Sequence, residues 1–250
     1  MEAVGRLDGH GTGESSWARC AWLWQRADTP LPQLVGAARR LLVVAPHPDD
    51  EVLACAGLMR LAADAGVDVH VVAVTDGEAC YPDDPWWTPD RLRRQRRQEL
   101  RDALHALGLA RTGITHLAID DGGVSAAEEA LGDALCGEVR HDDLVLAPWR
   151  HDGHPDHEAS FRAARQAVRH ATARLLEYPV WGWHWLDPCV AQHAWAHPRL
   201  LDVRSHAMAK QAAIACFRTQ TGAVERLQSP PILPAHVLAR FGRSREVFLA

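Results

Sequence analysis

Several features that would place this 250-residue chain in other protein classes are missing. No apolar run approaches the roughly 18 residues that a membrane-spanning helix needs. The opening residues, MEAVGRLDGHGTGESS, have no apolar core of the kind that a secretory signal carries. Excess positive charge is also lacking, because 27 Lys and Arg against 32 Asp and Glu give a formal net charge of −5. We therefore expect a cytoplasmic protein with no membrane span and no nucleic-acid partner.

Paired cysteines and ordinary aromatic residues are scarce as well. The six cysteines form no C-x-x-C pair, and a chain of this length needs no disulfide bonds to fold. There are only 4 Phe and 2 Tyr, but 10 Trp and 15 His. A histidine excess suits metal or acid–base chemistry, and only the placement of the histidines can decide between these uses.

The hydrophobic pattern predicts an α/β fold. Short apolar runs alternate with helical patterns, which indicates βαβ units and a mostly parallel sheet. The runs fall at residues 41–45, 69–74, 114–119, 144–147 and 175–180, and the helical patterns at 50–65, 89–107, 125–139, 157–170 and 205–217. Right-handed crossovers then favour a Rossmann-like, doubly wound sheet with helices on both faces.

The chain divides into an extension and one domain. Residues 1–38 begin Gly-rich and polar and continue into a Trp-bearing helical stretch, and we expect this N-terminal extension to pack on the domain. Residues 39–250 contain no internal repeat and no linker rich enough to split them, so they are predicted to form a single domain.

Two polar loops follow two of the predicted strands. The sequence APHPDDE, residues 45–51, comes directly after the first strand, and WRHDGHPDHE, residues 149–158, directly after the fourth. In the usual strand order 3-2-1-4-5 these strands are neighbours. The crevice between their carboxyl ends is where such folds bind ligands, so we expect the two loops to converge there.

The residue types in these loops suit a catalytic metal. His47, Asp50 and His157 offer two imidazoles and one carboxylate, which leaves a coordination position open, as in catalytic zinc sites. Zinc lowers the pKa of a bound water to about 7. Asp49, next to Asp50 but pointing elsewhere, is a candidate general base.

His154 precedes His157 by one helical turn and is a candidate to stabilise an oxyanion or to protonate a leaving amine. Asp156 is a candidate to fix the tautomer of His154. Taken singly, an H-P-D turn is usually a helix cap and a lone histidine is usually solvated. Two such turns at neighbouring strand ends favour a metal site.

On these two motifs, A-P-H-P-D-D-E and H-P-D-H, the sequence resembles the PIG-L (LmbE-like) family of zinc-dependent N-deacetylases. The resemblance covers residues 38–222. It implies removal of an N-acyl group, usually acetyl, from an amino sugar or related glycoside by attack of zinc-bound water. The implied roles are metal ligands for Zn²⁺, or for Fe²⁺ or another divalent ion (His47, Asp50, His157), a base (Asp49), an oxyanion-stabilising histidine (His154) and its supporting carboxylate (Asp156).

Two weaker matches to the family follow. Arg96, Glu99 and the later Leu107-Gly108 resemble a family pattern in which the arginine faces the substrate or the released carboxylate. The alternative is an exposed helical arginine. Near the end, the family's Lys…His-x-Ser-Gln pattern is matched from Lys210, but Phe217 stands where the histidine is usual.

Other interpretations of the sequence remain open. Two histidines and a carboxylate also form the facial triad of non-haem iron oxygenases, and a non-catalytic glycan-binding module is a third interpretation. Trp181, Trp183 and Trp185 alternate as they would on one face of an extended segment. The expected partner is a small N-acylated amino sugar or glycoside, with specificity in residues 76–95 and 181–198, and a homo-oligomer is left open.

Overall fold

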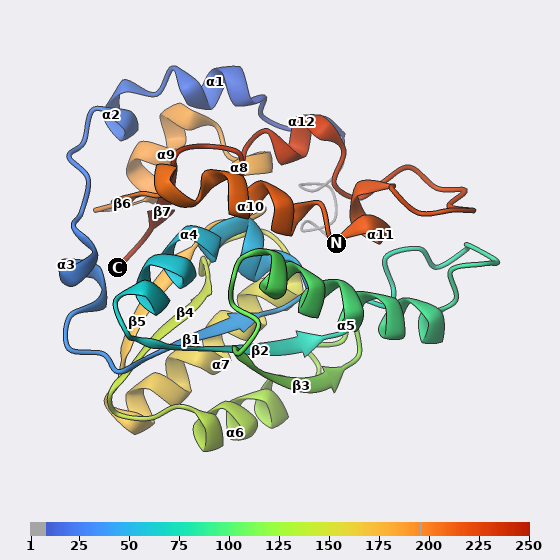
Figure 1. Cartoon of the computed structure of the whole chain (residues 1–250), viewed down its shortest axis with the longest axis horizontal. Coiled ribbons are helices and arrows are strands. Elements are labelled where there is room, and N and C mark those ends of the chain that lie inside the picture. The colour runs from blue at the N-terminus through green and yellow to red at the C-terminus, as the bar shows by residue number, and fades with distance from the viewer. Residues whose placement is uncertain (1–8, 196) are drawn as a thin grey trace.

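Five parallel strands form the central sheet in the order β3-β2-β1-β4-β5 (Figure 1). The computed structural model describes residues 9–195 and 197–250. The strands are β1 (Arg40–Ala45), β2 (Asp68–Thr75), β3 (Gly113–Ile119), β4 (Asp143–Pro148) and β5 (Arg174–Tyr178). Every residue of β1 and β4 is buried, as expected for central strands covered on both faces. The predicted strand order and the adjacency of β1 and β4 are confirmed.

Helices cover the two faces of the sheet. On one face lie α4 (Asp50–Asp64) and α5 (Pro89–Ala106), with α10 (Ala207–Ile214) packed on both, and on the other lie α6 (Glu128–Glu138) and α7 (Pro155–Ala171) (Figure 1). Alternate residues of β1 serve the two faces: Leu41 and Val43 join the core under α4, whereas Leu42 and Val44 join the core under α6 and α7. This is the predicted Rossmann-like, doubly wound α/β fold.

Some elements differ from the sequence-based expectation. The helix α6 begins at Glu128 rather than after Ser125, whose hydroxyl instead donates to the carbonyl oxygen of Pro155. The expected helix at 205–217 is a short 3₁₀ turn, η2 (Arg204–His206), followed by α10. A second, antiparallel sheet of β6 (Arg199–Asp202) and β7 (Arg245–Phe248) was not predicted, because four-residue strands leave little periodic signal.

The remaining helices are short. They are α1 (Glu14–Ala18), α2 (Ala21–Trp24), α3 (Leu31–Val35), α8 (Gly182–Trp185), α9 (Pro188–Ala194), α11 (Arg218–Thr221) and α12 (Ala235–Leu238). Within the described residues, every helix is too short or too polar to cross a membrane.

The prediction of an extended segment at residues 181–185 was wrong, because these residues form the helical turn α8. The carboxylate of Asp152 accepts the backbone N–H groups of Val180, Trp181 and Gly182 at 2.8–3.0 Å. A carboxylate on consecutive amides favours the start of a helix. In this turn Trp181 faces His154, Trp183 packs against Trp17 and Trp195, and Trp185 stacks on Trp149.

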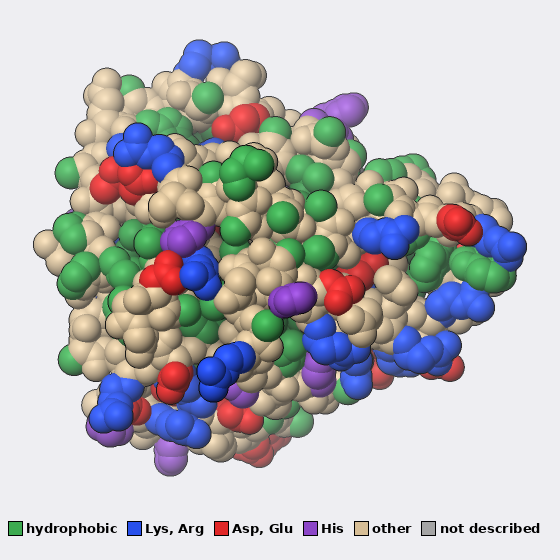
Figure 2. Space-filling view, in the orientation of Figure 1, with side chains coloured by type: hydrophobic (Ala, Val, Ile, Leu, Met, Phe, Trp, Pro, Cys, Tyr) green, Lys and Arg blue, Asp and Glu red, His purple; other side chains and the backbone are tan. Residues whose placement is uncertain are grey.

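The arginine-rich helix α5 lies at the surface shown in Figure 2, where side chains of both charges gather. Arg97 pairs with Asp76 at 2.6 Å, and Arg93 pairs with Glu78 at 3.0 Å. These arginines therefore form local ion pairs that hold α5 against the loop after β2.

The first described residues pack against the C-terminal half of the chain. Trp17 is fully buried, and its indole N–H donates to the carbonyl oxygen of Trp183 at 2.8 Å. Its ring stacks on Trp195 with centroids 5.2 Å apart and meets the edge of Trp183 at 4.7 Å. Residues 1–8 of the expected extension lie outside the described residues.

Replacing Trp17 tests how much this packing stabilises the protein. Trp17→Ala should lower the free energy of unfolding by about 3–5 kcal/mol, the usual cost of removing a buried tryptophan. Val190→Ala, at a side chain that is 54% exposed, should change it by less than about 0.5 kcal/mol. Denaturant unfolding measures both, and equal small effects would show that the N-terminal segment adds little stability.

Candidate metal centre and active site

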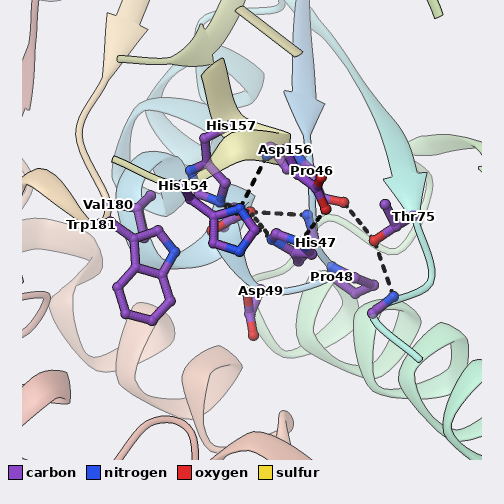
Figure 3. Close-up of polar contacts among 12 residues, drawn as sticks. Pro46, His47, Pro48, Asp49, Thr75, His154, Asp156, His157, Val180 and Trp181 are labelled. Atoms are coloured by element: carbon purple, nitrogen blue, oxygen red, sulfur yellow. Dashed lines mark hydrogen bonds and ion pairs between the residues drawn. The ribbon is translucent and has the colours of Figure 1, made fainter. Parts of the chain in front are cut away.

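The loops after β1 and β4 meet at the carboxyl edge of the sheet, as predicted (Figure 3). Asp50 begins α4, and His157 lies in the first turn of α7. Nε2 of His157 lies 3.3 Å from Oδ2 of Asp50 and 3.3 Å from Nδ1 of His47, and Nδ1 of His47 lies 3.4 Å from the same Asp50 oxygen. The structure therefore brings the three predicted ligands together as a nearly equilateral triangle.

The size of this triangle fits a metal ion. Ligand atoms about 2.0–2.1 Å from a tetrahedral zinc ion stand about 3.3–3.4 Å apart, which is the spacing seen here. All three atoms lie within 4.8 Å of one another, the residues are buried or nearly so, and three ligands leave a fourth position open. These side chains are thus able to hold a divalent ion of the zinc type.

The outer ring nitrogens of both histidines face carboxylates. Nδ1 of His157 lies 2.8 Å from Oδ2 of the fully buried Asp152. Nε2 of His47 lies 3.2 Å from Asp121 and 3.4 Å from Asp156. Such contacts fix the tautomer and the ring orientation that a metal needs.

Sequence reasoning missed two of these partners. Asp152 stands five residues before His157 in the same polar loop, which was a usable signal. Asp121 follows the end of β3, at the sheet edge where the site forms, but no spacing pattern ties it to His47.

The electrostatics of the cluster favour positive charge. Burial lowers the pKa of His157, but Asp50 and Asp152 outweigh it and raise that pKa to about 9. Burial likewise opposes ionisation of Asp50, yet His157 and His47 hold the pKa of Asp50 well below its usual value. A surplus of carboxylates around two imidazoles is an environment that suits a bound cation.

Asp49 is held in an unusual backbone conformation. It is the N-cap of α4 and has a φ of 149°, a value that residues other than glycine rarely adopt. Backbone strain of this kind is typical of functional sites. Its carboxylate Oδ2 lies 3.0 Å from Nη2 of Arg96. Burial raises the pKa of Asp49 to about 7, although Arg96 opposes the rise.

Arg96 is buried rather than exposed, so the alternative of a solvated helical arginine was wrong. Its guanidinium donates to the carbonyl oxygens of Gly77 and Pro48 at 2.8 Å, in addition to its contact with Asp49. Arg96 therefore anchors the loops after β1 and β2 to each other and lies against the candidate base.

His154 and Asp156 interact differently from the expectation. Nδ1 of His154 accepts the backbone N–H of Asp156 at 3.2 Å, whereas the Asp156 carboxylate faces His47 and accepts the amides of Gly122 and Val124. The prediction that this carboxylate fixes the tautomer of His154 is thus not what the contacts show. The backbone amide takes that place and leaves the proton of a neutral His154 on Nε2. Burial lowers the pKa of His154 to about 3, which favours the neutral form.

A cavity of about 370 Å³ opens over these residues. Six of its lining residues carry a charge or an imidazole: His47, Asp49, Asp50, Arg96, Asp121 and His154. The rest is mostly apolar and comprises Leu53, Ala79, Cys80, Gly122, Val180, Trp181, Gln220, Ile232 and Leu233.

The C-terminal segment from Lys210 to Gln220 contacts α5 and the cavity. Glu99 accepts the hydroxyl of Thr219 at 2.6 Å and its backbone N–H at 3.0 Å, and the neighbouring Gln220 lines the cavity. Phe217 is fully buried in the core, and Lys210 forms a buried ion pair with Glu246 at 2.8 Å. At this position the chain therefore has a core residue in place of a polar side chain.

Comparisons with known proteins agree with this geometry. Residues 42–168 match the family model PIG-L, described as GlcNAc-PI de-N-acetylase. A Bacillus cereus protein named "Probable N-acetyl-alpha-D-glucosaminyl L-malate deacetylase 2" is 32% identical over 135 residues, which are 52% of this chain and 61% of that protein. The 2'-N-acetylparomamine deacetylase of Streptomyces fradiae is 33% identical over 172 residues, 58% of each chain. The chain thus spans about three fifths of the length of these curated relatives.

Among solved structures, the conserved protein TT1542 from Thermus thermophilus is similar, with a TM-score of 0.59 and 28% identity. The match covers 84% of this chain and 93% of that one, so it extends well beyond the two polar loops.

Gly77 tests the packing around Arg96. Gly77 has φ +64°, and a Cβ there would lie 1.8 Å from Nη1 of Arg96. Gly66 has a comparable φ of +81° with nothing within 4 Å, so Gly66→Ala reports the backbone cost alone. Gly77→Ala should lower the free energy of unfolding by about 1–3 kcal/mol more than Gly66→Ala does. Equal losses in denaturant unfolding would mean that Arg96 moves aside freely.

Proposed function

The chain belongs to the PIG-L family, and from this membership we propose that it is a metal-dependent hydrolase that removes an N-acyl group from an amino sugar or related glycoside. The observation that carries the proposal is the triangle of His47, Asp50 and His157 in a cavity that also contains Asp49 and His154. The relatives named as deacetylases favour hydrolysis over an iron oxygenase or a non-catalytic glycan-binding module. We take residues 39–250 as the catalytic domain and residues 1–38 as its extension.

We assign His47, Asp50 and His157 as the ligands of a divalent ion, with Zn²⁺ as the ion that their spacing fits. A bound ion of this type supplies a Lewis acid and lowers the pKa of water to about 7. Asp152 positions His157 for this role, and Asp121 and Asp156 position His47.

Asp49 is the proposed general base. Its carboxylate lines the cavity and points away from His47 and His157 (Figure 3). It takes a proton from the attacking water as the new C–O bond forms, and gives that proton to the amine nitrogen as the C–N bond breaks. The products are a free carboxylic acid and the amino sugar.

His154 is proposed to stabilise the carbonyl oxygen as negative charge develops on it. Because Nδ1 accepts the amide of Asp156, Nε2 is the donor that remains. Arg96 holds Asp49 in place and lines the same cavity, and we assign its positive charge to binding of the substrate or the released carboxylate.

The assignment of Asp49 is tested by Asp49→Asn, which keeps the shape of the side chain but cannot accept the proton. The variant should bind zinc as the unmodified protein does and lose about 10²–10⁴-fold in the rate of amine release from N-acetylglucosamine derivatives. Asp83→Asn, at an exposed carboxylate on the loop after β2, should leave the rate unchanged. Full activity of Asp49→Asn would reject the base assignment.

Metal affinity, rather than activity, tests whether Asp152 positions His157 as a ligand. Its carboxylate accepts from Nδ1 of His157 and from three backbone amides, and an amide group in Asp152→Asn cannot accept from all of them. Zinc affinity measured by chelator competition should fall by about 10–100-fold. Asp187→Asn, at the exposed N-cap of α9, should keep the unmodified affinity, and an equal affinity in both variants would remove Asp152 from the metal site.

A further inference from the structure

The cavity lining combines charged and apolar groups. Asp49, Arg96 and Asp121 supply charge, whereas Val180 and Trp181 present an apolar wall beside His154 (Figure 3). The ring centroids of Trp181 and His154 are 6.1 Å apart, with the planes 23° from parallel. Trp181 therefore lies directly beside His154.

This wall is held rigidly. Asp152 accepts the backbone N–H groups of Val180 and Trp181 at 3.0 and 2.9 Å. Leu233, in the proline-rich sequence SPPILP, also lines the cavity, and its backbone N–H donates to the carbonyl oxygen of Gln220 at 2.9 Å. A preformed apolar surface binds an apolar ligand without the cost of ordering its own side chains.

Sugar hydroxyls find few hydrogen-bond partners on such a wall, and a sugar ring contacts it only through a C–H face stacked on the indole of Trp181. A buried hydroxyl without a hydrogen-bond partner costs free energy, and the side chains of Val180, Trp181 and Leu233 offer no acceptor. The charged part of the cavity, with Arg96 and Asp121, offers the partners that a sugar ring needs. The wall instead favours hydrocarbon, which gains about 0.8 kcal/mol for each methylene buried.

The proposed chemistry fixes which part of the substrate meets which surface. The amide nitrogen must face Asp49, which returns the proton, and the carbonyl oxygen must face His154. The sugar continues from the nitrogen. The acyl chain leaves the carbonyl carbon in the remaining direction, and Val180 and Trp181, which line the cavity beside His154, are the apolar side chains placed to receive it. Resting on the proposed function, we propose that the cavity accepts N-acyl chains several carbons longer than acetyl, with Trp181 as a residue that determines this specificity.

The test compares N-acetyl-, N-butyryl- and N-hexanoylglucosamine with the zinc-loaded protein, with release of glucosamine as the readout. The ratio kcat/KM should rise about fourfold for each methylene added, until the cavity is full. In Trp181→Ala the preference for hexanoyl over acetyl should fall toward one, and Trp181→Phe should retain most of it. Met208→Ala, at a side chain that is 78% exposed, is the control and should keep the whole preference.

Two results would overturn the acyl assignment. One is equal or better turnover of the acetyl substrate. The other comes from methyl and hexyl glycosides of N-acetylglucosamine: a gain from the hexyl group there, with none in the acyl series, would place the apolar group on the other end of the substrate.

Failure of the hydrolase proposal would give a different result from failure of the acyl-chain proposal. If the zinc-loaded protein released glucosamine from none of the substrates, the hydrolase proposal would fail, and calorimetric binding of hexanoate and acetate would then decide the inference about the wall. Tighter binding of hexanoate that is lost in Trp181→Ala supports the acyl site. Equal binding of the two acids contradicts it.

Discussion

The parallel pairing of β1 with β4 is the constraint on which the site depends. The two strands run side by side from Arg40–Asp143 to Val43–Leu146, although 103 positions separate Arg40 from Asp143 in the chain. Their loops leave at the same edge and lead into α4 and α7 on opposite faces of the sheet, so neither of these two helices fills the space between the loops. The ligand atoms of α4 and α7 meet in that space.

Asp152 links this metal centre to the substrate cavity. Its buried carboxylate accepts hydrogen bonds from Nδ1 of His157 and from the backbone amides at the start of α8. A buried carboxylate is costly unless its oxygens are fully bonded, and here four donors satisfy it. Because the same group orients a ligand and places Trp181 beside His154, the geometry of the metal centre and the shape of the cavity wall are set together.

The fold was largely predictable because buried parallel strands and their helices leave strong periodic signals. The convergence of His47, Asp50 and His157 was predictable for the same reason, since it follows from strand order and the position of each loop. The finer contacts were not. Whether the Asp156 carboxylate faces His154 or His47 depends on the turn before α7, and sequence spacing does not resolve that turn. The helical turn at 182–185 depends on Asp152, thirty residues away, so local alternation of Trp predicted the wrong structure.

The most direct test of the metal centre is a crystal structure of the protein soaked with zinc, with the ion located by anomalous scattering. We predict one strong peak about 2.0–2.1 Å from Nδ1 of His47, from a carboxylate oxygen of Asp50 and from Nε2 of His157, with the cavity open on its fourth side. A peak bound elsewhere, or no peak at this triangle at full zinc loading, would contradict the assignment.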